Sequence, residues 1–333
     1  MMEKNVRVVD NTDMQEAEKK KSFPEVKQPE YFFWGAFVLA GILFLFPEGK
    51  VTTEPKQQTA AVYVASIDPY ETVSLEAKAA VVLDTRTKRI LFEHNANTAL
   101  PLASLTKIMT ATTALSLVPE TTVVPIGDEA LREEGDAGLV PGDEWLLRDL
   151  LALTLLESSN DGARAVAETA GAVALGSPSP AGGRAFFIEQ MNRAARELSL
   201  QTLSFKNESG LDVSPSVAGG YGGAYDVAAL FARALAAYPA IFEPTRWDKT
   251  VLSGNGENGF SARNTNRETG KFPLLIASKT GYTDLAGGNL ALAFDAGFNR
   301  PIIIVVLGST YEGRFSDAEK LVWATLEHLA SAR

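Results

Sequence analysis

Segments rich in β-branched and apolar residues lie near both ends of the chain and enclose a long helical middle. Residues 79–95 form two such runs around a polar turn, which predicts a β-hairpin. From about residue 101 to 240, apolar residues recur every three or four positions, as they do in helices. Strand-like runs return after residue 245, and residues 315–330 form a last amphipathic helix. We therefore expect one sheet built from both chain ends, carrying a helical insertion.

An uninterrupted apolar run, residues 31–46, precedes this domain and ends at Pro47. As a helix it would span roughly 24 Å, slightly less than the ~30 Å hydrocarbon core of a bilayer. Tyr31 and Trp34 could anchor one membrane interface. A cleavable signal peptide is the alternative, but a long segment precedes the run and no small-x-small cleavage site follows closely. We interpret residues 31–47 as an uncleaved transmembrane signal anchor.

Flanking positive charge predicts the orientation of this anchor. Basic side chains are more frequent before the run than just behind it: Lys4, Arg7, Lys19, Lys20, Lys21 and Lys27 precede it, and Lys50 and Lys56 follow. Residues 1–30 should therefore stay in the cytoplasm, where their charged composition predicts a disordered tail. Residues 48–72 are polar and contain prolines, which predicts a linker to an exported domain of residues 73–333.

The composition excludes several kinds of site. A net charge of −10 argues against a nucleic-acid partner, because phosphate binding needs clustered Lys and Arg. The absence of cysteine excludes disulfides, thiol catalysis and cysteine-bound metals. The two histidines, His94 and His328, leave little for a histidine metal site. We expect neither a metal nor a cofactor.

The stretch PLASLTKIMTA, residues 101–111, places a hydroxyl and an amine three residues apart, at Ser104 and Lys107. Pro101 suits the first turn of a helix, so we expect Ser104 in that turn and Lys107 on the same face. The helix dipole favours an oxyanion near Ser104, and together with burial it lowers the pKa of Lys107. Such Ser–Lys pairs can replace a Ser-His-Asp triad, although the bare spacing also fits a surface lysine.

A second cation follows in IASKTGYTD, residues 276–284. A β-run should deliver Lys279, Thr280 and Gly281 at its exposed end. Gly281 would allow the backbone of a substrate to approach the strand closely.

The stretch LLESSNDGA, residues 155–163, places Ser158 and Asn160 at a break between two helices. The serine offers a proton relay, and the asparagine offers a donor and an acceptor to a substrate amide. Ser253 and Asn255 have the same spacing, but they lie in a Gly/Asn-rich stretch that is typical of a hairpin loop. We therefore favour Ser158 and Asn160.

Ser-x-x-Lys, Ser-x-Asn and Lys-Thr-Gly, in this order, form the signature of penicillin-interacting serine enzymes. With FIEQMNRAARELSL, FKNESGLD and RFSDAEKLVW, the sequence resembles the D-alanyl-D-alanine carboxypeptidase family, the low-molecular-mass penicillin-binding proteins, from about residue 77 to 330. The resemblance implies the α/β (α+β) penicillin-binding/β-lactamase-like transpeptidase fold. Its sheet would be mainly antiparallel and flanked by helices, with an inserted helical subdomain at about 101–240. Together with the predicted anchor, the resemblance leads us to expect a single-pass protein of the bacterial plasma membrane with an extracytoplasmic catalytic domain.

The resemblance assigns catalytic roles to matching positions. Ser104 would be the acylated nucleophile and Lys107 the general base. Ser158 would pass a proton to the leaving D-alanine, and Asn160 would bind the peptide amide of the substrate. Ser159 stands where the family more often has Gly or Asp, which bears on substrate preference rather than on chemistry.

The resemblance also implies how substrate is held. Lys279 and Thr280 would bind its terminal carboxylate beside Gly281. The backbone N–H groups of Tyr282 and of the nucleophile would form the oxyanion hole. Arg314 either helps to bind the carboxylate or is an ordinary arginine at the start of a helix.

These assignments predict a serine-type D-Ala-D-Ala carboxypeptidase that acts on peptidoglycan stem peptides and is acylated by β-lactams. A DD-endopeptidase would use the same residues. A class A β-lactamase needs a deacylating glutamate on a loop before the Lys-Thr-Gly strand, and we find no convincing Glu-x-x-x-Asn segment there. A catalytically silent wall-binding protein would have no chemical reason to keep Ser104, Lys107, Asn160 and Lys279 together.

Overall fold

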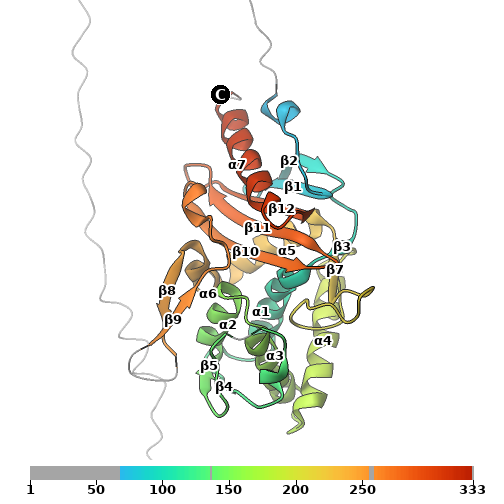
Figure 1. Cartoon of the computed structure of the whole chain (residues 1–333), viewed down its shortest axis with the longest axis vertical. Coiled ribbons are helices and arrows are strands. Elements are labelled where there is room, and N and C mark those ends of the chain that lie inside the picture. The colour runs from blue at the N-terminus through green and yellow to red at the C-terminus, as the bar shows by residue number, and fades with distance from the viewer. Residues whose placement is uncertain (1–67, 136, 255–258, 332–333) are drawn as a thin grey trace, which may run out of the picture. The chain divides into compact units, whose positions relative to one another are not determined.

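A five-stranded antiparallel sheet, in the order β10-β11-β12-β1-β2, forms the centre of the computed structural model. The structure describes residues 68–135, 137–254 and 259–331. The strands are β1 (Ala79–Asp84), β2 (Arg89–His94), β10 (Leu275–Thr283), β11 (Gly287–Asp295) and β12 (Pro301–Ser309). Figure 1 shows strands from both chain ends side by side in this sheet. The expected hairpin, and the sheet built from both chain ends, are therefore confirmed.

Helices cover both faces of this sheet. Alternate residues of β12 point to opposite faces. Ile303, Val305 and Leu307 belong to the core shared with α5 (Ala224–Ala237). The other buried apolar residues of β12 belong to the core shared with α7 (Gly313–Ser331). Because neither face meets water, β12 is apolar at almost every position and shows no alternation. Figure 1 shows the two helices on opposite sides of the strands.

The helical insertion expected at about 101–240 is present between β2 and β10. Its α-helices are α1 (Thr106–Leu117), α2 (Leu147–Leu156), α3 (Asn160–Leu175), α4 (Pro180–Glu197), α5 and α6 (Pro239–Phe242). Between them lie 3₁₀ turns and short strands: β3 (Leu100–Pro101), η3 (Ala103–Leu105), β4 (Val123–Pro125), η4 (Ala130–Arg132), β5 (Glu144–Leu146), β6 (Ser204–Phe205), β7 (Gly220–Gly222) and η5 (Glu243–Arg246). The hairpin of β8 (Lys249–Leu252) and β9 (Phe260–Arg263), followed by η6 (Thr269–Lys271), leads back to the sheet.

The predicted tail (1–30) and anchor (31–47) lie outside the described residues, as does the predicted linker up to residue 67. Among the residues that are described, no single helix is long and apolar enough to cross a membrane; only the bent pair Ala224–Ala237 and Pro239–Arg246, at 112°, passes on length and composition.

The last residues of the segment assigned to the linker belong to the folded unit. They form a 3₁₀ turn, η2 (Pro69–Thr72), in which Tyr70 is buried. The Tyr70 hydroxyl lies 2.8 Å from Thr325 Oγ1 of α7, and its ring stacks on Phe92 of β2 at 5.3 Å. The polar, proline-containing sequence of this segment did not indicate that Tyr70 is buried.

Asp317, on α7, joins the two ends of the sheet domain. Its carboxylate is fully buried and accepts hydrogen bonds from the backbone N–H groups of Glu76 and Ala77, at 3.1 and 2.9 Å. It also accepts one from Ser309 Oγ at 2.8 Å. One carboxylate therefore fixes the segment before β1 and the end of β12 to α7.

We expect Asp317→Ala to lower the free energy of unfolding by about 2–4 kcal/mol, because buried donors would lose an ionised acceptor. Urea unfolding followed by circular dichroism measures the change. Asp128→Ala, at an exposed aspartate, is the control and should stay within about 0.5 kcal/mol of the wild type. Equal stability of both variants would contradict this role for Asp317.

Candidate active site

Ser104 lies in the 3₁₀ turn η3, directly before α1. The expected helix start at Pro101 is wrong: Pro101 belongs to β3 and pairs with Tyr221 of β7, and the α-helix begins at Thr106. Between strand and helix, Ala103 has a φ of +47°, a conformation that costs energy for a residue other than glycine. Such strain is common where a fold presents a reactive group, and here it presents the half-buried Ser104.

Lys107 is fully buried, and three oxygens surround its amine. Its Nζ lies 3.0 Å from Ser104 Oγ, 2.6 Å from Asn160 Oδ1 and 2.8 Å from the carbonyl oxygen of Ser209. Two of these oxygens can only accept hydrogen bonds, and a neutral amine has two N–H groups and one lone pair. The neutral Lys107 can therefore give both N–H groups to Asn160 and Ser209, which leaves its lone pair for the Ser104 hydroxyl.

The surroundings of Lys107 favour this neutral form. Burial lowers its pKa to about 7, although the nearby carboxylates of Glu208 and Glu133 act in the opposite direction. In water, with a pKa of ~10.4, roughly one lysine in 2,500 would be neutral at pH 7. With a pKa of about 7, about half of the molecules carry a neutral Lys107 at that pH.

Ser158 and Asn160 lie at the junction between α2 and α3, as predicted. Ser158 has a φ of +64°, so that this junction is a second strained turn at the site. Ser159 caps α3, its hydroxyl accepting a hydrogen bond from Gly162 N at 2.8 Å. The side chain at 159 therefore has a structural role, which the sequence did not reveal.

The contacts of the two Ser-x-Asn candidates distinguish them. Ser158 Oγ lies 2.9 Å from Lys279 Nζ, and Asn160 contacts Lys107. Ser253 follows β8 in the loop of the β8–β9 hairpin, and Asn255 lies outside the described residues. The geometry thus brings the favoured pair, Ser158 and Asn160, to both lysines.

We expected Lys279 at the exposed end of a strand, and this expectation is wrong. Lys279 is buried within β10, with 1% of its surface exposed. Thr280 is buried as well and donates a hydrogen bond to Thr265 Oγ1 at 2.6 Å. Burial, and then the positive charges of Lys107 and Arg314, lower the pKa of Lys279 well below its usual value. The sequence pattern missed this burial because the helical insertion covers β10.

Gly281 brings the backbone of β10 against η3, the turn that carries Ser104. A Cβ atom at this position would lie 2.9 Å from the Leu102 carbonyl oxygen and 3.2 Å from Ser104 N. The requirement for glycine therefore comes from the protein's own turn, whereas we had expected it to come from a substrate backbone. Tyr282, the next residue, is 47% exposed beside the site.

Arg314 at the start of α7 holds this strand. It is buried, and its Nη1 donates a hydrogen bond to the Gly281 carbonyl oxygen at 2.9 Å. Its guanidinium lies 4.3 Å from the centre of the Tyr311 ring, and that ring packs edge-on against Tyr282 at 5.1 Å. Arg314 is thus more than a surface arginine at a helix start, because it fixes the backbone between Thr280 and Tyr282.

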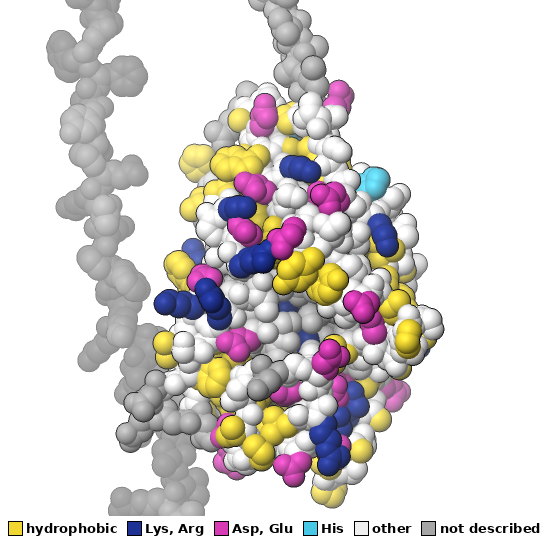
Figure 2. All heavy atoms as spheres, viewed as in Figure 1, with side chains coloured by type: hydrophobic (Ala, Val, Ile, Leu, Met, Phe, Trp, Pro, Cys, Tyr) yellow, Lys and Arg dark blue, Asp and Glu magenta, His cyan; other side chains and the backbone are white. Residues whose placement is uncertain are grey.

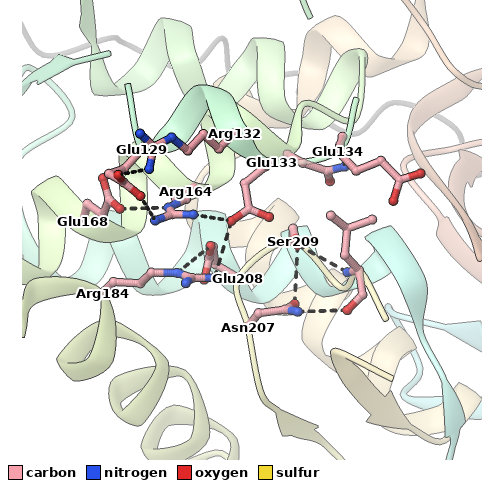
Figure 3. Close-up of polar contacts among 12 residues, drawn as sticks. Glu129, Arg132, Glu133, Glu134, Arg164, Glu168, Arg184, Asn207, Glu208 and Ser209 are labelled. Atoms are coloured by element: carbon pink, nitrogen blue, oxygen red, sulfur yellow. Dashed lines mark hydrogen bonds and ion pairs between the residues drawn. The ribbon is translucent and has the colours of Figure 1, made fainter. Parts of the chain in front are cut away.

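Two carbonyl oxygens at the site were not predicted. The Ser209 carbonyl binds Lys107, and the Glu134 carbonyl accepts a hydrogen bond from Asn160 Nδ2 at 2.5 Å. Figure 3 shows Ser209 and Glu134 with the side chains around them. Any residue type carries a carbonyl, so no sequence signal could have found them.

A groove of about 520 Å³ opens beside these residues, and Glu134, Asp212, Tyr282 and Asp284 are among those that line it. Figure 2 shows the surface hollowed near its centre, with basic side chains at the bottom. Within residues 68–135, 137–254 and 259–331, no three His, Asp or Glu side chains are grouped so that they could hold a metal ion.

The chain is similar to known proteins in sequence and in fold. Residues 64–310 match the model of the peptidase S11 family, D-alanyl-D-alanine carboxypeptidase. The D-alanyl-D-alanine carboxypeptidase DacF of Bacillus subtilis is 31% identical over 254 residues, which cover 74% of this chain and 61% of DacF. A D-alanyl-D-alanine endopeptidase of Pseudomonas aeruginosa is 30% identical over 254 residues, covering 74% of this chain and 76% of the relative.

Solved structures agree. Penicillin-binding protein D2 of Listeria monocytogenes, in its ampicillin-bound form, matches with a TM-score of 0.61 and 26% identity, covering 76% of this chain and 98% of that one. The chain spans 61% of the length of DacF and 62% of that of DacC of Escherichia coli, so it matches only part of these relatives. By the family match and by its fold, the chain belongs to the peptidase S11 family of D-alanyl-D-alanine carboxypeptidases.

Proposed function

We propose that this protein is a serine-type D-Ala-D-Ala carboxypeptidase, which removes the terminal D-alanine of peptidoglycan stem peptides through an acyl-enzyme on Ser104. The contacts of Lys107 carry this proposal: two oxygens that only accept hydrogen bonds leave its lone pair to Ser104. Family membership supports the reaction class. The ampicillin-bound form of penicillin-binding protein D2 supports β-lactams as ligands of this chain.

In the first step, Lys107 takes the proton of Ser104 Oγ, which attacks the carbonyl carbon of the penultimate D-alanine. The developing oxyanion accepts hydrogen bonds from the backbone N–H groups of Ser104 and Tyr282. The C–N bond then breaks, and the proton passes from Lys107 through the Ser158 hydroxyl to the leaving amine. Water attacks the ester with Lys107 again as base, which frees Ser104 and the shortened peptide.

Lys279 and Thr280 bind the terminal carboxylate of the substrate, and Asn160 binds its peptide amide. Because Lys279 contacts Ser158, a carboxylate held there lies beside the proton relay. This negative charge raises the pKa of Lys279, so that Lys279 stays charged and Lys107 is the lysine that becomes neutral. Arg314 contributes by fixing Gly281.

The same site could serve a DD-endopeptidase, and the Pseudomonas aeruginosa relative carries that name. The two activities differ in the leaving group, which is free D-alanine for a carboxypeptidase and a cross-linked peptide for an endopeptidase. Mass spectrometry of digested peptidoglycan distinguishes them: loss of one D-alanine from uncross-linked pentapeptides supports our proposal. Conversion of cross-linked dimers alone would support the endopeptidase.

We also propose that residues 31–47 anchor the protein in the bacterial plasma membrane, with residues 1–30 in the cytoplasm. The apolar run and the positive charges before it support this location. The full-length protein should stay in the membrane fraction at high salt and leave it only in detergent. A membrane-free form that begins near residue 60 would contradict the anchor.

We expect the full chain to gain the mass of benzylpenicillin, because slow deacylation leaves the drug bound to Ser104. Ser104→Ala should remove the adduct completely, and intact-protein mass spectrometry measures it. Ser158→Ala should slow D-alanine release, whereas the matched control Ser253→Ala should leave it unchanged.

Three results would contradict these assignments. An adduct that persists in Ser104→Ala would exclude Ser104 as the nucleophile. Hydrolysed benzylpenicillin without any adduct on the wild type would indicate a β-lactamase. Neither adduct nor hydrolysis, with no release of D-alanine, would favour a catalytically silent protein.

We expect kcat/KM for D-alanine release to fall as the pH drops below about 7, because protonation of Lys107 removes the base. At higher pH, kcat/KM should fall again as Lys279 loses the charge that binds the carboxylate. A pH profile of D-alanine release measures both limbs. A profile that stays flat between about pH 5 and 8 would rule out Lys107 as the base, since a lysine of this pKa titrates there.

A further inference from the structure

Arg184, on α4, lies outside every recognised motif and yet contacts two acidic residues from separate segments. Its Nε donates hydrogen bonds to both carboxylate oxygens of Glu208, at 3.0 and 3.1 Å. Its Nη2 lies 3.8 Å from Glu133 Oε1. Figure 3 shows the guanidinium end of Arg184 directed toward both carboxylates.

Glu208 directly precedes Ser209, whose carbonyl binds Lys107. The Glu208 side chain is fully buried, and its own carbonyl accepts a hydrogen bond from Thr110 Oγ1 of α1 at 2.6 Å. Residue 208 is therefore held at its side chain by α4 and at its backbone by α1. This double attachment determines where the next carbonyl, that of Ser209, lies relative to Lys107.

Glu133 stands in the same relation to Asn160. It directly precedes Glu134, whose carbonyl accepts the Asn160 amide N–H. Besides Arg184, the Glu133 carboxylate contacts Arg164 Nη1 of α3 at 2.7 Å. The Glu134 carbonyl determines which end of the Asn160 amide faces Lys107, because the amide nitrogen must point toward this carbonyl.

We propose that Arg184 is a positioning residue for the catalytic lysine: by pairing with Glu133 and Glu208 it holds the two backbone carbonyls that orient Asn160 and Lys107. This inference rests on the proposed role of Lys107 as the base. Arg184 touches neither Ser104 nor the substrate in this scheme. It acts only through the two acidic residues.

Loss of Arg184 should have two effects. Both carbonyls would be held less firmly, and small displacements of reacting groups slow catalysis considerably. Glu208, whose pKa burial already raises, would then lack the cation that opposes this effect, and would take up a proton rather than remain as an unpaired buried charge.

The second effect, protonation of Glu208, should change the pKa of Lys107 in one direction only. The charged groups that influence it are Lys279 of β10, Glu133 and Glu208. Because the negative charge of Glu208 raises the pKa of Lys107, protonation of Glu208 lowers that pKa. General loosening of the fold would do the opposite, since water entering the site would raise the pKa toward its ordinary value.

The test compares Arg184→Met with Arg193→Met in the full chain. Arg193 lies on the same helix and pairs with Glu197 at the surface, so its loss is a matched control. The rate of Ser104 acylation by benzylpenicillin is measured at a series of pH values by quenching the reaction and recording intact-protein mass spectra. In Arg184→Met this rate should fall roughly tenfold to a hundredfold. The pH below which the rate declines (the acid limb of the profile) should move to a lower value. Arg184→Lys, which keeps one charge, should recover part of the rate, and Arg193→Met should match the wild type.

A second variant removes the risk that a lone buried carboxylate unfolds the protein. Arg184→Met combined with Glu208→Leu replaces the ion pair by apolar side chains, a change that proteins often tolerate. It should acylate as slowly as Arg184→Met and show the same low acid limb. A wild-type rate in either variant, or an acid limb moved to higher pH, would overturn the proposal.

An independent measurement separates failure of this proposal from failure of the proposed function. The side-chain NMR signal of Lys107 in protein labelled at lysine reports its titration without any substrate. If the wild type is not acylated, the catalytic role of Lys107 fails. The effect of Arg184 on Lys107 can still be tested, because Arg184→Met should lower the titration midpoint of Lys107. An unchanged midpoint would overturn the proposed role of Arg184.

Discussion

The burial of Lys107 is the constraint on which the rest of the site depends. A lysine amine without access to water needs oxygen partners, and the fold supplies three of them, from η3, from α3 and from the segment after β6. The same burial lowers the pKa of Lys107, so that the neutral amine is populated near pH 7. One physical effect therefore demands the surrounding contacts and gives Lys107 the property that a base requires.

The architecture brings these groups together at the edge of the sheet. β10 is one of the two edge strands of this sheet, and η3 of the helical insertion packs against it at Gly281. The two serines of the site, Ser104 and Ser158, lie at turns with positive φ at Ala103 and at Ser158 itself. Positive φ at a residue other than glycine costs energy and persists only where the surrounding structure holds it.

The sequence predicted the groups with distinctive side chains and failed where backbone atoms or burial decide. Ser104, Lys107, Ser158, Asn160 and Lys279 stand out because their side chains recur at fixed spacings, and the structure brings them together. The order of strands and helices could be predicted as well, since periodicity reports which faces are buried. The start of α1 could not, because Pro101 fits a strand edge as readily as a first helical turn.

The burial of Lys279 could not be predicted either, because the sequence of a strand does not show which segments cover it. Its position has a consequence for charge. Lys107, Lys279 and Arg314 are all buried, and each loses part of its preference for the charged form. Glu208 is the fully buried carboxylate near the amine of Lys107, and Arg184 already pairs with it. In the proposed reaction, a substrate carboxylate at Lys279 would stabilise the positive charge on this buried amine, while the neutral Lys107 would remain free to accept the proton of Ser104.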